Sequence, residues 1–365
     1  MEKKYDYLIV GCGFSGIVLA ERLSSIGKKI LIVDKRSHIG GNCHDYKSGK
    51  ILVGKYGAHI FHTKNKDVFE YLNRFTKFTN YRHKVLAYYK DKYFPIPINL
   101  TTVNKFFNIN LKDEKELKNF LKSKIKDIKK IKNSRDVVIS KFGKELYEAF
   151  VRTYTKKQWD KDPEELDKLV LERLPIRYNE NDLYFDDPFQ GMPKNGYTKM
   201  FEKMLSNKNI EIRLGTSYTK NLKKIAKNVV WTGKLDEYFD YKFGRLEYRS
   251  INFVFESYKM KDFLPNSVVN FPEEKYKFVR IIEYKKFYEN DFKDTIICRE
   301  FFTWGEEPIY PIADKRNINL LKKYTKVAKK EKNVYFIGRL GRYKYINMDQ
   351  CVEDAMGLFE KIKNH

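Results

Sequence analysis

The stretch that decides the fold is YDYLIVGCGFSGIVLAERLSSIGKKILIVD, residues 5–34. The mostly apolar run at 5–10 predicts a buried strand. A GxGxxG pattern follows, and apolar residues then recur at helical spacing over 17–27. Residues 29–33 predict a second strand, which ends at Asp34. This order of strand, glycine turn, helix, strand and terminal acid predicts a dinucleotide-binding unit.

Each glycine of the pattern has its own expected role. Gly11 permits the tight turn, Gly13 lets the backbone approach a pyrophosphate, and Gly16 lets the helix pack closely on the strand. The helix N-terminus offers free N–H groups and a positive dipole to phosphates. Asp34 can accept hydrogen bonds from ribose hydroxyls. For the glycines alone, a purely structural turn is the alternative.

The residues after Asp34 favour FAD over NAD. Lys35 is followed by Gly40, Gly41 and Asn42, and an acid with two glycines at this distance resembles the flavoprotein superfamily of amine oxidases and their relatives. The second glycine pair would bring another backbone segment close to the cofactor. Near the C-terminus, NVYFIGRLG at 333–341 predicts a strand and glycine turn that return to the flavin, with Arg339 and Met348 beside it.

Length and composition exclude several classes of protein. A chain of 365 residues predicts two or three domains. No apolar run approaches the roughly 20 residues that span a bilayer, and no leader pattern precedes the first strand. The four cysteines are scattered without metal-ligand spacing, which favours free thiols and a cytoplasmic protein.

The formal charge of +25 raises the hypothesis of a nucleic-acid site. No helix-turn-helix, zinc-finger or RRM signature supports it, and lysines spread over solvated faces are the favoured interpretation. A small anionic substrate such as a nucleotide diphosphate would also suit this charge, through local focusing of the field.

The remaining pattern predicts a hairpin, a helical segment and a sheet. Residues 87–100 read as a hairpin, and 101–159 show a helical stripe with lysines on its back. That stripe could rest on an anionic membrane surface, but core packing is favoured. Strands at 251–257, 276–284 and 294–301 predict an antiparallel sheet. His59 and His62 have no third ligand at a suitable spacing, so zinc is discounted. The helical stripe within 101–159 consists of Leu111, Leu117, Leu121, Ile125 and Ile128.

Several longer stretches resemble the UDP-galactopyranose mutase family, over nearly the whole chain. The resemblance implies an α/β fold, with a Rossmann-like FAD-binding domain, a helical domain and an antiparallel β-sheet domain. The implied boundaries are 1–80, 195–232 and 325–365 for the FAD-binding domain, 101–180 for the helical domain with a mobile loop at about 166–178, and 81–100, 181–194 and 233–324 for the sheet domain. The stretches include YGAHIFHT, YFPIPINL, GKELYEAFVRTYTKKQW, ERLPIRYNENDLYF, FQGMPKNGYTKM and GRLGRYKYINMD.

The resemblance also implies the reaction. Family members are mutases, a class of isomerase, that interconvert UDP-galactopyranose and UDP-galactofuranose. N5 of reduced FAD attacks the anomeric carbon and displaces UDP, the sugar ring opens through a flavin iminium, and no net redox change results. The implied partners are the UDP-sugar, an external reductant such as NADPH and a second copy of the chain in a homodimer. The implied setting is cytoplasmic biosynthesis of cell-surface polysaccharide.

The family's site residues transfer to matching positions here. Two arginines would hold the diphosphate, because a guanidinium binds phosphate oxygens bidentately, and His59 would tune N5. His62 would also lie by the flavin ring. The implied catalytic residues are His59, Arg173 and Arg280. The implied substrate-binding residues are His83, Phe150, Tyr154, Trp159, Arg173, Tyr184, Asn270, Arg280, Tyr310 and Tyr345. The cofactor-binding residues are Gly11, Gly13, Gly16, Asp34, Lys35, Gly41, Asn42, His59, Arg249, Arg339 and Met348.

Four positions depart from the family pattern. Ala58 replaces a common proline, and His83 replaces a common asparagine. Tyr284 replaces a common histidine, and Asn347 replaces a common aspartate. A pocket altered in this way could admit UDP-N-acetylgalactosamine, which is the near alternative. A net-redox flavoprotein of the amine-oxidase type is the second alternative, and a non-enzymatic basic binding protein is the third.

Overall fold

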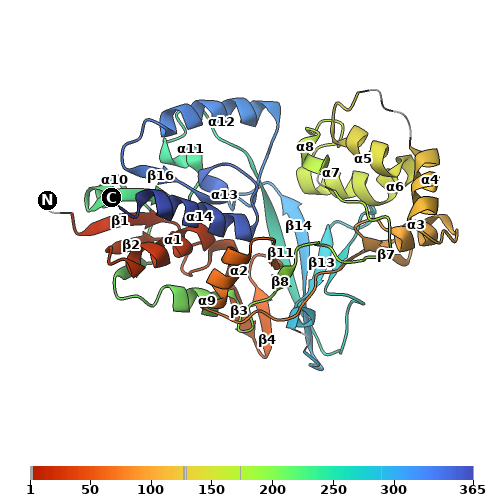
Figure 1. Cartoon of the computed structure of the whole chain (residues 1–365), viewed down its shortest axis with the longest axis horizontal. Coiled ribbons are helices and arrows are strands. Elements are labelled where there is room, and N and C mark those ends of the chain that lie inside the picture. The colour runs from red at the N-terminus through yellow and green to blue at the C-terminus, as the bar shows by residue number, and fades with distance from the viewer. Residues whose placement is uncertain (1–2, 126–127, 129, 173, 289, 365) are drawn as a thin grey trace.

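Two large sheets and a group of short helices make up the fold (Figure 1). The structure is a computed structural model that describes residues 3–125, 128, 130–172, 174–288 and 290–364. No helix in these ranges is both long and apolar enough to cross a bilayer. The predicted α/β class with a Rossmann-like unit is confirmed.

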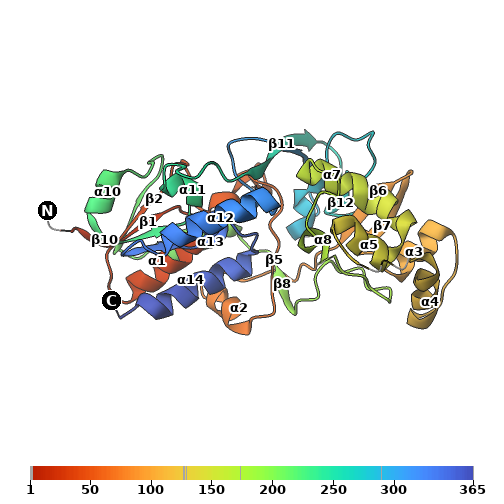
Figure 2. The same ribbon diagram turned by 90° about the horizontal axis from the view of Figure 1, so that it is seen from above.

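The first sheet is parallel and has the strand order β16-β10-β1-β2-β9. Its strands are nearly fully buried at the centre because helices cover both faces, as parallel sheets require. Tyr7 and Ile9 face α1, α9 and α14, whereas Leu8 faces the opposite side. Helices α1 and α14 run side by side along one face (Figure 2). The strands are β1 (Tyr5–Val10), β2 (Ile30–Val33), β9 (Ile210–Arg213), β10 (Ala226–Trp231) and β16 (Val334–Phe336). The helices are α1 (Phe14–Ser25), α9 (Tyr197–Met204), α13 (Gly338–Gly341) and α14 (Met348–Ile362).

The second sheet has seven strands in the order β15-β11-β14-β13-β12-β6-β7 and is antiparallel except where β12 meets β6. The predicted hairpin is present, and Lys90 and Asp91 form its turn with positive φ angles. Register brings Arg280 on β13 opposite Glu300 on β14. The strands are β6 (Val85–Tyr89), β7 (Lys92–Ile96), β11 (Tyr248–Tyr258), β12 (Val268–Asn270), β13 (Arg280–Glu283), β14 (Thr295–Thr303) and β15 (Tyr310–Pro311).

The helical group differs from the single stripe that the sequence suggests. Asn99, Asp113 and Asn133 each cap a new helix with a side-chain oxygen, so the segment breaks into short pieces. Only Leu117 and Leu121 of the stripe lie within α4, while Leu111, Ile125 and Ile128 lie outside it and still pack against the same cluster. The pieces are α3 (Leu100–Phe107), α4 (Glu114–Lys124), α5 (Ser134–Phe142), α6 (Lys144–Leu146), the π-helix η2 (Tyr147–Arg152), α7 (Thr153–Trp159) and α8 (Leu169–Glu172).

The other elements connect these parts. β5 pairs with β8 and thereby joins distant parts of the chain. One expected domain boundary, at residue 324, falls inside α12, which packs against α11 and the parallel sheet's side of the molecule. The elements are 3₁₀ turns η1 (Gly41–Cys43) and η3 (Tyr284–Tyr288), strands β3 (Asp45–Ser48), β4 (Ile51–Gly54), β5 (Phe61–Thr63) and β8 (Phe189–Gly191), and helices α2 (Lys66–Asn73), α10 (Lys220–Lys224), α11 (Leu235–Tyr238) and α12 (Lys315–Ala328).

Gly16 makes the close contact between α1 and β1 possible. A Cβ at this position would lie 2.2 Å from the carbonyl oxygen of Gly11 and 3.2 Å from a methyl group of Ile9. Because Ile9 is held in the core and the Gly11 carbonyl belongs to the backbone of the glycine turn, a side chain at Gly16 would push the helix off the strand.

We therefore expect Gly16→Ala to lower the free energy of unfolding by about 1–3 kcal/mol through overpacking. The matched control is Gly357→Ala at an exposed position of α14, where an added Cβ meets nothing within 4 Å. The control should be neutral or slightly stabilising, since alanine favours helix. Urea denaturation of the two variants measures both values, and equal stabilities would contradict this packing.

Candidate active site

A cavity of about 1130 Å³ opens at the carboxyl ends of the parallel strands. Val10, Val33 and Trp231 end β1, β2 and β10, and all three line it. This edge is where open α/β sheets bind their ligands. Of the cofactor-binding residues expected from the sequence, those in the lining are Gly11, Gly13, Asp34, Lys35, Gly41, Asn42, His59, Arg339 and Met348.

Two glycine loops shape the cavity at its phosphate-binding end. A Cβ on Gly13 would meet only Gly41, whose Cα is 3.8 Å away, and a Cβ on Gly41 would lie 3.0 Å from the Cα of Gly13. The backbone is therefore bare on both sides, and Gly13 is also the N-cap residue of α1, without a side-chain cap. Bare backbone at a helix N-terminus fits the diphosphate of a dinucleotide such as FAD.

Asp34 is held in place at the end of β2. Its Oδ2 accepts the Cys12 backbone N–H at 2.7 Å, and its Oδ1 accepts the Arg36 backbone N–H at 2.9 Å. Each carboxylate oxygen keeps lone-pair capacity for a further donor. The carboxylate can therefore accept a ribose hydroxyl, as its place in the sequence predicts.

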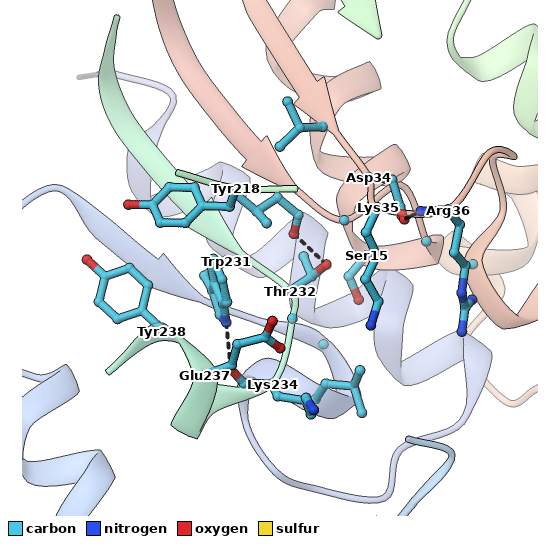
Figure 3. A pocket seen from close by; sticks show the side chains of 18 of the residues that line it. Ser15, Asp34, Lys35, Arg36, Tyr218, Trp231, Thr232, Lys234, Glu237 and Tyr238 are labelled. Atoms are coloured by element: carbon cyan, nitrogen blue, oxygen red, sulfur yellow. Dashed lines mark hydrogen bonds between the residues drawn. The ribbon is translucent and has the colours of Figure 1, made fainter. Parts of the chain in front are cut away.

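The sequence reading missed one wall of the cavity. The rings of Tyr218, Trp231 and Tyr238 stand across from Asp34 and Lys35 (Figure 3). Tyr218 and Tyr238 each meet Trp231 nearly edge-on, at ring-centroid distances of 5.1 and 5.2 Å. The sequence does carry a signal for this wall, because its residues lie at or after the ends of strands of the parallel sheet. The strand before Tyr218, β9, is short and only half-buried, so its pattern did not stand out in the sequence.

A second cluster is built around a buried ion pair on the antiparallel sheet. Arg280 Nε donates to Glu300 Oε2 at 2.5 Å, and Glu300 is fully buried. Burial opposes the charge on Arg280, but the Glu300 carboxylate outweighs it and holds the pKa of the guanidinium well above its ordinary value. Arg280 therefore stays a cation.

Aromatic rings connect this cluster to the cavity. Tyr310 and Tyr345 are stacked, with 5.4 Å between ring centroids and 11° between ring planes. The guanidinium of Arg339, which lines the cavity, lies 4.7 Å from the centroid of Tyr345 and 5.9 Å from that of Tyr310. Trp159 meets the edge of Tyr310 at 6.2 Å. Electrostatic interaction with Arg280 acts on both Tyr154 and Tyr310, which places these phenols around the cation.

Three histidines near the site have different surroundings. Burial lowers the pKa of His59 to about 4, and the charges of Arg339 and Arg280 act in the same direction. Burial lowers the pKa of His83 to about 3, with Arg280 again contributing. His62 Nδ1 instead forms a hydrogen bond with the carboxylate of Asp187, and its ring stacks on Phe185 at a centroid distance of 3.6 Å. Among these three, His59 lines the cavity, and its imidazole is neutral near pH 7.

Other predicted site residues have structural partners. Phe150 packs within the helical group against Tyr89, Phe94 and Phe106, and its expected contact with the substrate stays a prediction. The backbone of Asn270 pairs with Arg280. Tyr184 meets His83 edge-on at 5.4 Å. Arg173 lies outside the described residues.

Arg249 lies away from the cavity lining. Its Nε donates to the carbonyl oxygen of Gln158 at 3.1 Å and its Nη2 to that of Lys157 at 3.3 Å. The guanidinium also stacks on Trp304 at 4.7 Å. This side chain ties β11 to the end of α7, because the C-terminal carbonyls of a helix need donors. One guanidinium nitrogen, Nη1, is buried and has no hydrogen-bond partner among the described residues, so a contact of Arg249 with the cofactor stays a prediction.

The positions that depart from the family pattern have local explanations. Tyr284 is buried and donates to the carbonyl oxygen of Gly54 at 2.8 Å. Asn347 caps α14 in a reciprocal arrangement with Gln350. Nδ1 of His83 lies 3.0 Å from the hydroxyl of Tyr81. Ala58 packs against the large core cluster. No group of three or more metal-ligating side chains occurs in the described part of the chain.

Known proteins share both the sequence and the fold. A family model described as UDP-galactopyranose mutase matches residues 149–345, and one described as an NAD(P)-binding Rossmann-like domain matches 9–75. The probable UDP-galactopyranose mutase of Klebsiella pneumoniae is 37% identical over 357 residues, which cover 96% of this chain and 93% of that protein. The dTDP-fucopyranose mutase of Escherichia coli is 34% identical over 361 residues, with 96% of each chain covered.

The fold comparison agrees. A crystal structure of reduced UDP-galactopyranose mutase superposes with a TM-score of 0.77 over 99% of this chain and 94% of that one, at 14% identity. Full-length similarity in sequence, together with a cavity suited to a dinucleotide, leads to one conclusion. The chain belongs to the UDP-galactopyranose mutase family.

Proposed function

We propose that this chain interconverts UDP-galactopyranose and UDP-galactofuranose. Family membership makes it an FAD-dependent isomerase, and the proposal concerns its substrate and the work of its residues. The observation that carries the proposal is the buried Arg280–Glu300 pair, which holds a cation among phenol rings next to the cofactor cavity.

The cavity residues would hold FAD from its diphosphate to its ring. The backbone at Gly13 and Gly41 suits the diphosphate, Asp34 suits a ribose, and His59 and Arg339 lie further along the lining. Bound there in its reduced form, the flavin supplies a nucleophilic nitrogen for the anomeric carbon. Neutral His59 can hydrogen-bond in this region without adding positive charge.

Arg280 would hold the diphosphate of the nucleotide sugar. Glu300 takes the Nε–H, and no described residue accepts a hydrogen bond from either Nη group. Two parallel N–H donors match two phosphate oxygens. Because Glu300 fixes the guanidinium, little rotamer entropy is lost when phosphate binds. The leaving UDP would thus stay close enough to return.

The tyrosines would complete the diphosphate site as neutral donors. Burial raises the pKa of Tyr154 and of Tyr310 well above the ordinary range, so both hydroxyls keep their protons. Each can then donate to a phosphate oxygen. Tyr345 stacks on Tyr310 and fixes the direction of that ring.

The segment expected to close over the substrate packs on the helical group here. Leu171 is buried, and Lys141 Nζ donates to the carbonyl oxygens of Glu172 at 2.5 Å and Leu174 at 3.3 Å. We propose that these contacts, with the apolar packing of Val170, Leu174 and Ile176, break and re-form when the segment at about 166–178 moves over the nucleotide sugar.

The remaining expectations about partners and setting also stay proposals. An external reductant such as NADPH would return the flavin to its reduced state, and two chains would form a homodimer. Buried free thiols at Cys12, Cys43 and Cys298 suit a reducing cytoplasm.

A second candidate substrate comes from the relatives. The Escherichia coli protein that matches nearly all of this chain acts on a dTDP-fucopyranose, by its name. The nucleotide base and the sugar C6 substituent are therefore the two features to vary. UDP-N-acetylgalactosamine remains the third candidate, because His83 is buried close to Tyr184 in the expected sugar pocket.

The direct experiment is turnover of three furanose substrates by dithionite-reduced holoenzyme, with products separated by chromatography. We expect kcat/KM for UDP-galactofuranose to exceed that for dTDP-fucofuranose and for UDP-N-acetylgalactofuranosamine by about tenfold or more. The same protein with oxidised flavin is the control and should be inactive. A preference for dTDP-fucofuranose would replace the proposed substrate, and equal turnover with oxidised flavin would exclude the mechanism.

For Arg280→Ala we expect a loss of roughly 10²–10³-fold in kcat, because a preorganised cation opposite the leaving group is removed. Arg280→Lys keeps the positive charge but loses the paired N–H donors of the guanidinium, and its kcat should fall at least about tenfold. The control is Arg299→Ala, one residue from Glu300 on β14 but on the other face of the sheet. FAD content, read from absorbance, should stay unchanged in all three. Wild-type rates in Arg280→Ala would remove this residue from the site.

The buried neutral histidines should make stability depend on pH. Their folded pKa values of about 3 and 4 lie below the unfolded value of 6.5, so the unfolded state binds more protons as pH falls. The stability that depends on neutral imidazole is complete above about pH 6.5 and is lost toward pH 4. His83→Gln should reduce the fall in unfolding free energy between pH 6 and 5 by roughly 1 kcal/mol. Urea titrations at each pH test this, and an unchanged slope would show that His83 is not buried as a neutral group.

A further inference from the structure

Helix α12 has two sides of opposite character. Asn317, Leu320 and Tyr324 are buried on its inner side, where they pack near Leu235 and Tyr343. The outer side carries Lys315, Lys322, Lys323, Lys326 and Lys329, all exposed, which together form the lysine face. At about 100° per residue these five positions fall within roughly 120° of arc.

The lysine face is uncovered and uncompensated. In Figure 1, α12 lies along the top edge of the molecule, and in Figure 2, which is seen from above, no other element lies in front of it. None of its five lysines forms an ion pair within the described residues. The acids at the two ends of the helix are already paired: Asp314 with Lys161 at 2.7 Å and Glu331 with Lys223 at 3.3 Å.

Neighbouring cations enlarge this surface. Lys330 and Lys332 continue the chain beyond the helix, and both are exposed. Lys242 and Arg245 are exposed on the turn that packs against α12, where Phe243 meets the ring of Tyr324 at 5.2 Å. By contrast, lysines of α4 alternate with acids and form pairs such as Lys118 with Glu114.

We propose that the lysine face binds membranes that contain anionic lipids. Several unpaired lysines on one flat helix face complement a negatively charged lipid surface. Flexible ammonium groups suit lipid headgroups, which are mobile and need no fixed geometry. The buried side of α12 is used by the protein's own core, so the contact is electrostatic and does not insert the helix.

Nucleic acid is a weaker match to the same surface. Sites for single-stranded nucleic acid combine basic residues with aromatic rings on which bases stack. The lysine face has no aromatic residue, and the one arginine of α12, Arg316, is paired with Glu247 at 3.2 Å. The observations therefore favour lipid.

The test is co-sedimentation of the FAD-loaded protein with vesicles of phosphatidylcholine containing about one quarter phosphatidylglycerol, at about 0.15 M salt. The triple variant Lys322→Glu, Lys326→Glu, Lys329→Glu reverses the lysine face. The matched control reverses three exposed lysines in or beside α4, as Lys112→Glu, Lys115→Glu, Lys122→Glu, and has the same net charge. Flavin absorbance and mutase turnover without vesicles should be the same in all three proteins.

We expect wild type and the α4 control to bind anionic vesicles, the lysine-face variant to bind about tenfold or more weakly, and none to bind pure phosphatidylcholine. Three results would overturn the proposal. One is the absence of binding by the wild type. Another is equal loss in both triple variants, which would mean that net charge alone acts. The third is tighter binding to labelled single-stranded or duplex DNA that the lysine-face variant abolishes.

Discussion

The buried ion pair between Arg280 and Glu300 is the interaction on which the site depends. The pair joins the neighbouring strands β13 and β14 of the antiparallel sheet. Its nitrogen–oxygen distance is short, and the Glu300 carboxylate is fully removed from solvent. Removing either partner of such a pair leaves an uncompensated buried charge, which costs about 3–5 kcal/mol. The fold therefore fixes a guanidinium in one direction before any substrate arrives.

The two sheets meet where this pair approaches the cavity. A Cβ on Gly57 would lie 2.4 Å from Glu300 Oε1, so the loop that carries His59 passes directly over the carboxylate. Arg339 comes from the other direction and stacks on Tyr310 and Tyr345. These close contacts place the neutral imidazole of His59 and the cations Arg280 and Arg339 at one junction, between the dinucleotide cavity and the tyrosines.

Local sequence rules predicted the parts that follow from short-range physics. The glycine turn, Asp34, the hairpin over 87–100 and the long antiparallel strands were all visible in the pattern. The role of Glu300 was not visible in the pattern. A single acid within an apolar strand does not reveal which residue of the neighbouring strand lies opposite it, and here that residue is Arg280. Arg249 is a different case: the family resemblance implies a contact with the cofactor, and the structure adds hydrogen bonds to the carbonyls that end α7, which no local pattern predicted.

The central claim is that Arg280, fixed by Glu300, receives the diphosphate of a nucleotide sugar. A crystal structure of the reduced protein with bound UDP tests it most directly. The account predicts phosphate oxygens within hydrogen-bonding distance of both Arg280 Nη groups while Nε stays on Glu300. UDP bound elsewhere, or an Arg280 side chain that leaves Glu300 to reach it, would contradict the account.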